Sequence, residues 1–216
     1  MKENTSKIHY EILDRKRLKL LDDLSPLVES FILAGGTALA LQINHRESYD
    51  FDFFSEKEIL PSLLVRLKNL VEISTVLINN SDELSLMTKD DIKLSFIYYP
   101  FKIKASTELK NGIKLFSIVD IAAQKAYTIG RRGAYRDYFD IYSLLWGNYL
   151  TLNEIIENAK KNYGEVFNPK LFLEQLVYFN DLNNFEIIPT DHNQKLPSNT
   201  KVREFLEKTV KNYLEN

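Results

Sequence analysis

The sequence contains no cysteine, which excludes disulfides, thiolate zinc sites and cysteine nucleophiles. Its three histidines, His9, His45 and His192, lie far apart and lack the spacing of metal ligands. No apolar run approaches the roughly 20 residues that span a bilayer, and the first residues do not resemble a signal peptide. We therefore expect a cytoplasmic protein that does not enter a membrane.

Glycine and proline are also scarce, with seven and six residues in a chain of 216. This scarcity suits a chain made mostly of regular elements. A net charge of -2 argues against a protein that coats nucleic acid by bulk charge, although it leaves room for a local basic patch. The apolar fraction of 44% and the charged fraction of 27% are those of an ordinary globular protein.

The pattern of apolar residues changes along the chain. Up to Lys104, short alternating runs predict about four strands, with helices before and between them. These strands are expected over Tyr49–Phe54, Glu72–Ile78, Leu84–Thr88 and Ile92–Tyr99. After Lys104 the period is helical, and capping signals at Thr151 and Asn168 help to place the helices. The expected helices are Val119–Gly130, Tyr135–Trp146, Leu152–Tyr163, Pro169–Phe179 and Lys201–Leu214.

We therefore predict an α+β fold with two domains. Residues 1–104 form an α/β domain with a small mixed sheet, and residues 105–216 form an all-helical domain that completes the active-site cleft. A cleft between two such halves is a common place for a ligand.

The segment Ala34–Ser55 combines two signals. Gly35 and Gly36 precede a small-residue helix, and Asp50 and Asp52 follow on a strand. An ordinary half-buried strand also alternates polar and apolar residues, so the pattern alone has a purely structural explanation. Two carboxylates side by side on a strand repel each other, however, and a divalent cation removes that penalty. Mg²⁺ typically uses one or two carboxylates together with substrate phosphates.

The helix that begins near Thr37 adds a phosphate site. Glycines allow the backbone to turn tightly and to approach a ligand. Free N–H groups at a helix start, together with the helix dipole and the Thr37 hydroxyl, favour an anion. A phosphate site followed by a metal-binding strand indicates a nucleotide site.

A second group of charged residues lies in the helical half. Lys125 falls within the apolar stripe of its helix, where it must snorkel, pair or bind an anion. Asp137 and Asp140 are neighbours on the next helix, and Arg136 has the spacing of an ion pair with Asp140. Arg131, Arg132 and Arg136 form a basic cluster that is either a solvated surface or a contact for phosphate or RNA.

These motifs together resemble the nucleotidyltransferase superfamily, and in particular the AbiEii/AbiGii toxin family of abortive-infection and type IV toxin–antitoxin systems. The resemblance covers about Phe31 to Leu145. It implies that Asp50 and Asp52 bind Mg²⁺ and that Lys125 contacts the phosphates of an NTP. It also implies a catalytic aspartate, with Asp137 the better match and Asp140 the second. The expected nucleotide-binding residues are Gly35, Gly36, Thr37, Arg46, Ser48 and Lys125.

The expected reaction is transfer of a nucleotide to a hydroxyl of an RNA, with tRNA among the candidates, or of a protein. A cognate antitoxin is an implied partner. One departure from the superfamily is Ser95, which stands where a third carboxylate is usual, while Asp90 and Asp91 occupy the preceding turn. Three hypotheses therefore stay open: an active transferase, a nucleotide-binding pseudoenzyme that acts through a protein partner, and a helical scaffold with no nucleotide site.

Overall fold

The computed structural model describes residues 7–102, 104–129, 131–191 and 193–215. The chain divides into two compact units between Ser117 and Ile118. Within the described ranges, no helix is long and apolar enough to cross a membrane.

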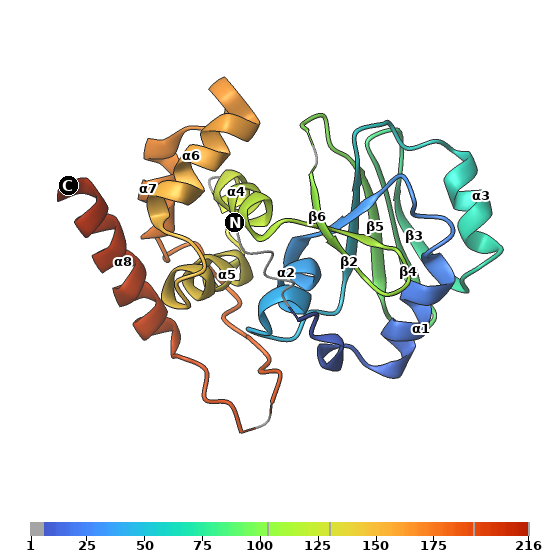
Figure 1. The fold of residues 1–216 in the computed structure, drawn as a ribbon, viewed down its shortest axis with the longest axis horizontal. Helices are drawn as coiled ribbons and strands as arrows, with labels where there is room; N and C mark the ends of the chain where they lie inside the picture. The colour runs from blue at the N-terminus through green and yellow to red at the C-terminus, as the bar shows by residue number, and fades with distance from the viewer. Residues whose placement is uncertain (1–6, 103, 130, 192, 216) are drawn as a thin grey trace. The chain divides into compact units, whose positions relative to one another are not determined.

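The first unit contains a seven-stranded mixed sheet with helices beside it (Figure 1). The strand order is β3-β4-β5-β2-β1-β7-β6. The pairs β2–β5 and β1–β7 are parallel and the other neighbours are antiparallel. Its elements are η1 (Tyr10–Ile12), α1 (Arg15–Leu24), β1 (Ile32–Ala34), α2 (Gly35–Ile43), β2 (Phe51–Ser55), α3 (Ser62–Lys68), β3 (Ile73–Asn79), β4 (Glu83–Thr88), β5 (Lys93–Tyr98), β6 (Ala105–Glu108) and β7 (Lys114–Phe116).

The four expected strands are present as β2, β3, β4 and β5, but the expected strand count is wrong. The three strands that were not expected, β1, β6 and β7, have only three or four residues each. Such strands are too short for a period-2 pattern to emerge. Residues 105–117 are therefore not helical as expected, because β6 and β7 pair with each other and β7 pairs with β1.

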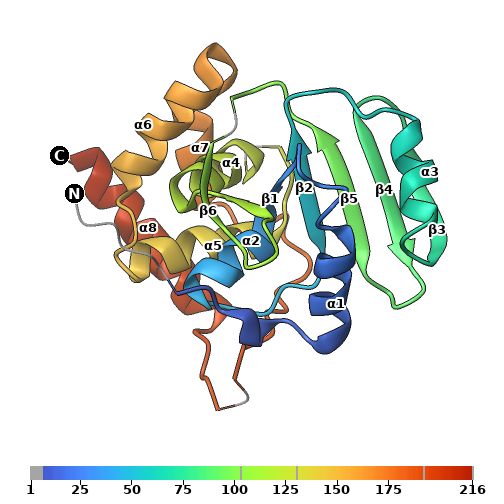
Figure 2. The same cartoon turned by 45° about the vertical axis from the view of Figure 1, so that its right-hand side comes forward.

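One face of the sheet supplies the core of this unit. Phe51, Phe53 and Phe96 are fully buried, and the rings of Phe53 and Phe96 are stacked with centroids 5.3 Å apart. Leucines of α1 and α3 are buried as well, and Figures 1 and 2 show these two helices next to β3, β4 and β5. The aromatic residues of the Asp50–Asp52 segment therefore point into a core, as their alternation predicts.

The second unit is helical. Its elements are α4 (Ile118–Ile129), α5 (Tyr135–Trp146), α6 (Leu152–Tyr163), η2 (Gly164–Val166), α7 (Pro169–Leu176) and α8 (Asn199–Glu215). The bounds of α5 and α6 agree with the sequence-based prediction, while α7 ends earlier than expected and α8 extends further at both ends. Gly130, the expected end of α4, lies outside the described residues.

The caps predicted at Thr151 and Asn168 are confirmed, and the capping box predicted at Ser117–Asp120 stays a prediction. The Thr151 hydroxyl accepts a hydrogen bond from the N–H of Glu154, and the Glu154 carboxylate accepts one from the N–H of Thr151. The Asn168 side chain accepts from the N–H of Leu171, and Pro169 follows in the first turn. These local signals explain why α6 and α7 begin where the sequence predicts.

Replacing Thr151 with alanine is expected to destabilise the protein by about 1 kcal/mol, since the cap loses its hydroxyl acceptor. Thermal unfolding should show a midpoint lower by roughly 2–4 °C. Thr151→Ser, which keeps the hydroxyl, should unfold close to the wild type. An equal fall of the unfolding midpoint in both variants would show that the capping hydrogen bond is not the source of this stability.

Candidate functional site

The glycine motif lies where β1 passes directly into α2. Gly35 has a positive φ of 69°, a conformation that glycine adopts without strain. The antiparallel pairing of β1 with β2 places Ala34, the residue before this turn, opposite Asp52. Asp52 therefore lies beside the start of α2.

The two glycines leave space for two charged side chains. A Cβ atom at Gly35 would lie 2.7 Å from Oδ2 of Asp52. A Cβ atom at Gly36 would collide with the Arg46 guanidinium and lie 3.1 Å from the Ser48 hydroxyl. The Asp52 carboxylate and the Arg46 guanidinium thus both lie against the N-terminal turn of α2.

Thr37 joins this turn to the segment that carries Asp50. Its hydroxyl donates to the Asp50 carbonyl and lies 2.9 Å from the Ser48 hydroxyl. Thr37 itself is 1% exposed. The Thr37 hydroxyl therefore fixes the backbone at Asp50. The contact of Thr37 with a nucleotide stays a prediction.

The loop before β2 is fixed from the other side by α1. The Arg17 guanidinium lies 4.4 Å from the centre of the Tyr49 ring, and its Nε donates to the Tyr49 carbonyl at 3.1 Å. The Tyr49 hydroxyl donates to Glu47, and this hydrogen bond is the main cause that raises the pKa of Tyr49 to about 12. Residues 46–50 are therefore held in place by side chains on both flanks.

Ser95 lies in β5, the strand expected over Ile92–Tyr99, and its correspondence to a third carboxylate stays a prediction. In the parallel pair β2–β5 it lies directly opposite Asp52, and in β4–β5 it lies opposite Ser85. Ser95 is 2% exposed, so a hydroxyl stands where a carboxylate would adjoin Asp52. In the part of the chain that the structure describes, no group of three His, Cys, Asp or Glu residues is arranged to hold a metal ion.

The residues present nevertheless fit a magnesium ion whose remaining ligands come from a bound substrate and water. Asp50 and Asp52 are both partly exposed, and each offers a hard carboxylate oxygen. Mg²⁺ is commonly held by two carboxylates, with phosphate oxygens and water as its remaining ligands. Asp50 and Asp52 are the residues that would hold it.

The helical unit contains a separate buried cluster. Lys125 of α4 is 5% exposed, and its Nζ lies 2.5 Å from Oδ1 of Asp137 and 2.8 Å from Oδ2 of Asp140, both in α5. The Nε of Arg132 lies 2.9 Å from Oδ2 of Asp137. Of the three outcomes expected for Lys125, the structure shows pairing. We call these four residues the Lys125 cluster; its two positive charges balance its two negative charges.

The charges of this cluster act on Asp137. Burial by itself raises the pKa of Asp137, but the neighbouring charges of Lys125 and Arg132 outweigh it and lower that pKa below its ordinary value. Asp137 and Asp140 are 1% and 0% exposed. Removing Lys125 would therefore leave two buried carboxylates without the positive charge that they share.

The remaining arginines of the expected basic cluster differ from each other. Arg131 stacks on the Tyr127 ring at 3.6 Å and donates to the Val166 carbonyl at 2.9 Å. Arg136 is exposed and does not form the expected i, i+4 pair, because Asp140 points inward to Lys125. The predicted contact of these arginines with phosphate or RNA stays a prediction.

The predicted site residues thus fall into two groups. Gly35, Gly36, Thr37, Arg46, Ser48, Asp50 and Asp52 lie together in the first unit, and Lys125, Asp137 and Asp140 lie together in the second. That the two groups serve one active site stays a prediction. Sequence reasoning missed the pairing of Arg132 with Asp137, for which the five-residue spacing is no signal because it spans a helix start.

Comparison with known proteins shows the family to which the chain belongs. A protein-family model described as nucleotidyl transferase AbiEii toxin, type IV TA system, matches residues 19–215. An uncharacterized protein of Aquifex aeolicus (strain VF5) is 33% identical over 194 residues, covering 88% of this chain and 91% of that protein.

Two solved structures show a more distant likeness. JHP933 from Helicobacter pylori is 18% identical, with a TM-score of 0.49, over 97% of this chain and 100% of that chain. The nucleotidyltransferase toxin MenT4 from Mycobacterium tuberculosis is 13% identical, with a TM-score of 0.38, over 94% of both chains.

The family match extends well beyond Phe31–Leu145, the range that the motifs cover. The C-terminal helices, in which sequence reasoning saw only a general helical likeness, belong to it almost to their end. The chain is therefore a nucleotidyltransferase and belongs to the AbiEii family of toxins from type IV toxin–antitoxin systems.

Proposed function

We propose that this nucleotidyltransferase uses Mg²⁺, held by Asp50 and Asp52, to transfer a nucleotide from an NTP to a hydroxyl of an RNA or a protein. Among RNA acceptors, tRNA is a candidate. The observation that carries this proposal is the position of the Asp52 carboxylate against Gly35, at the N-terminus of α2. There, the carboxylate that would bind the metal lies beside the helix N-terminus that would bind the phosphates.

The start of α2 suits the phosphates of the NTP. The first N–H groups of a helix have no partner within the helix, and the helix dipole adds positive potential. The Arg46 guanidinium lies against Gly36 in the same turn and adds a full positive charge. Together they favour a triphosphate next to the carboxylates that would hold the metal.

The chain's own residues orient this site. Thr37 fixes the backbone at Asp50, and the absent Cβ at Gly35 allows Asp52 to approach. A bound Mg²⁺ would neutralise phosphate charge and support displacement of pyrophosphate by the acceptor hydroxyl. Catalysis of this kind depends mostly on positioning and on charge stabilisation.

A catalytic role for the Lys125 cluster stays a proposal. To contact a phosphate, Lys125 must leave two carboxylates that now neutralise it. As an acceptor for the proton of the attacking hydroxyl, Asp137 is weakened, because its pKa is lowered. Holding α4 against α5 is the role that needs no rearrangement.

A cognate antitoxin is the protein partner that family membership suggests, and we propose the cytoplasm as the place of action. Neither proposal depends on the metal or on the acceptor. Both follow from the type IV toxin–antitoxin assignment of the family.

Asp52→Asn and Asp50→Asn are each expected to lower transfer by about 100-fold or more, because each loses an electrostatic contribution of about 3 kcal/mol or more. The measurement is Mg²⁺-dependent transfer of label from each of the four NTPs, labelled at the α-phosphate, to cellular RNA and protein. It also identifies the nucleotide and the acceptor.

Asp90→Asn is the matched control for this experiment. Asp90 is an exposed turn residue that pairs with Lys16 at 2.6 Å, so transfer should stay within a few fold of the wild type. Full transfer by Asp52→Asn would refute the proposed metal site. Absence of transfer by the wild type, with NTP binding intact, would favour a nucleotide-binding pseudoenzyme.

Ser95→Asp tests the metal site without reference to activity. The new carboxylate would lie opposite Asp52 in the sheet, so its charge should destabilise the protein in a chelator. Mg²⁺ should reverse this loss, since a ligand present at about 100 times its dissociation constant stabilises by about 2.7 kcal/mol. Thermal unfolding with and without Mg²⁺ is the measurement. An unfolding midpoint that Mg²⁺ leaves unchanged in this variant would argue against the site.

Lys125→Met is expected to destabilise the protein by about 3–5 kcal/mol, because two carboxylates stay buried without their lysine. In the wild type, the lowered pKa of Asp137 gives stability that is present above its unfolded pKa and is lost as the pH falls through its folded pKa. In the variant, the folded state should instead take up a proton, so its stability should fall as the pH rises above about 4. Urea unfolding at several pH values measures this reversal.

The control removes the three charges that pack together in the interior. Lys125→Met combined with Asp137→Asn and Asp140→Asn leaves no unpaired charge buried, and it should recover much of the lost stability. If Lys125→Met alone showed the same pH dependence as the wild type, the buried ion pairs would not be the cause.

A further inference from the structure

A surface hollow of about 660 Å³ lies on the helical unit, outside the motifs described above. It lies along the end of α5 and the first half of α8, and the segment before α8 borders it. Its lining includes three aromatic residues and three lysines: Tyr142, Trp146, Phe205, Lys195, Lys201 and Lys208. We call these six residues the Trp146 hollow.

The aromatic residues hold one ring in an exposed position. Trp146 stacks on Tyr142 with ring centroids 5.9 Å apart and an angle of 17°. Phe205 stands edge-on to both rings, at 5.2 Å from Tyr142 and 5.3 Å from Trp146. Tyr142 is buried, yet Trp146 is 64% exposed. The indole is therefore fixed by two neighbours while most of its surface faces solvent.

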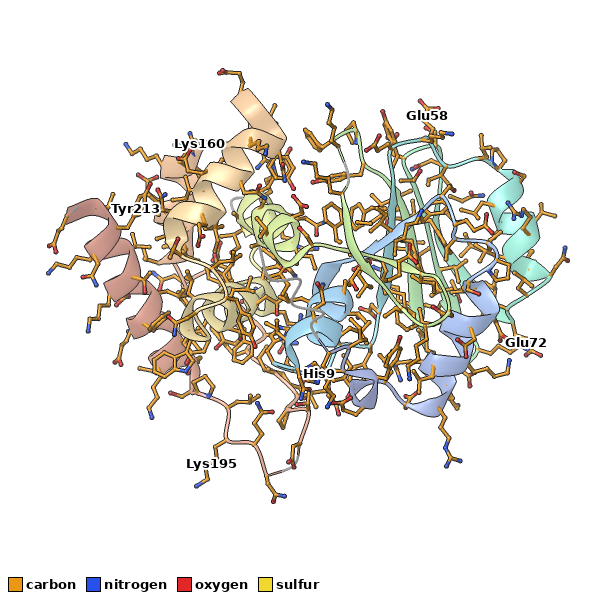
Figure 3. The ribbon with its side chains drawn as sticks, in the orientation of Figure 1. His9, Glu58, Glu72, Lys160, Lys195 and Tyr213 are labelled. Atoms are coloured by element: carbon orange, nitrogen blue, oxygen red, sulfur yellow. The ribbon has the colours of Figure 1, made fainter. Side chains whose placement is uncertain are left out.

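The lysines give the hollow a positive charge. Lys201 and Lys208 are seven residues apart on α8 and therefore lie on one side of it, while Lys195 precedes the helix (Figure 3). None of the three forms an ion pair in the described ranges, whereas Arg203 and Lys211 of the same helix pair with Glu207 and Glu215. Against the three lysines stands one glutamate, Glu204, in a chain whose net charge is -2.

An exposed, fixed aromatic ring beside unpaired lysines is the combination that binds single-stranded nucleic acid. Bases stack on aromatic side chains, and cations follow the phosphates. An acidic peptide would use the lysines but would leave the indole without a stacking partner. The hollow therefore favours a polymer that carries both flat rings and regular negative charges.

We propose that the Trp146 hollow binds a single-stranded segment of RNA, with one base stacked on Trp146 and the flanking phosphates near Lys195, Lys201 and Lys208. The choice of RNA rests on the proposed function, in which RNA is an acceptor. The binding itself needs no nucleotide transfer. The hollow thereby supplies the local basic patch that an acidic chain requires for such an acceptor.

Trp146 is the only tryptophan in the chain, so its fluorescence reports directly on this hollow. Titration with an oligouridylate of about ten nucleotides, without NTP or Mg²⁺, should quench it to saturation. The logarithm of the binding constant should fall against the logarithm of the salt concentration with a slope of about -2, as expected for three lysines on a single strand.

Two variants and two matched controls test the parts separately, with binding followed by the anisotropy of labelled RNA. Trp146→Leu should weaken binding about tenfold, whereas Tyr178→Leu, at another exposed aromatic residue of this unit, should not. Changing Lys195, Lys201 and Lys208 together to glutamine should flatten the salt dependence. The same change at Lys160, Lys170 and Lys211, which pair with glutamates outside the hollow, should leave most of the salt dependence unchanged.

Three results would overturn the proposal. The first is tryptophan fluorescence that stays constant while anisotropy shows that RNA binds. The second is an equal loss of RNA affinity in the variants and their controls. The third is stronger quenching by an acidic peptide than by RNA. The last would identify the hollow as a protein-docking site. Because the titration contains neither NTP nor Mg²⁺, RNA binding by an inactive Asp52→Asn protein separates a failed hollow from a failed transferase.

Discussion

The absence of a side chain at Gly35 and Gly36 is the constraint on which the nucleotide motif depends. Each glycine sits where a Cβ would meet a charged group, Asp52 in one case and Arg46 in the other. A carboxylate and a guanidinium can therefore approach the same helical turn, on which the dipole already favours an anion. Alanine at either position would displace one of them. The order of small residue, helix and acidic strand is thus a requirement of packing as well as of chemistry.

The Lys125 cluster follows a different logic. The first unit keeps Asp50 and Asp52 partly exposed, where a cation can reach them, whereas the second buries its carboxylates and neutralises them internally. A buried ion pair adds little net stability, but losing one partner is costly. The cluster therefore ties α4 to α5 more firmly than it prepares a free lysine. Any catalytic use of Lys125 must overcome that pairing.

The sequence predicted those features that depend on local pattern. The α5 and α6 bounds, the Thr151 cap and the strand that carries Ser95 follow from periodicity and capping chemistry, whereas the register that sets Ser95 opposite Asp52 came only from the structure. The three missed strands are held by pairing between distant segments, such as Leu33 with Leu115, and three residues carry no readable period. Spacing placed Lys125 in an apolar stripe, but the choice among snorkelling, pairing and anion binding depended on which helix packs against it.

The Trp146 hollow was invisible to sequence reasoning for a related reason. Trp146 reads as the last apolar residue of α5, and the contact that fixes its ring comes from Phe205 of α8, far along the chain. The lysines likewise look like an ordinary solvated helix face until the ion pairs of α8 are assigned. An acceptor must be held for longer than a collision if its hydroxyl is to attack a bound nucleotide. A site that combines stacking with charge meets this need without the wide basic surface that the composition excludes.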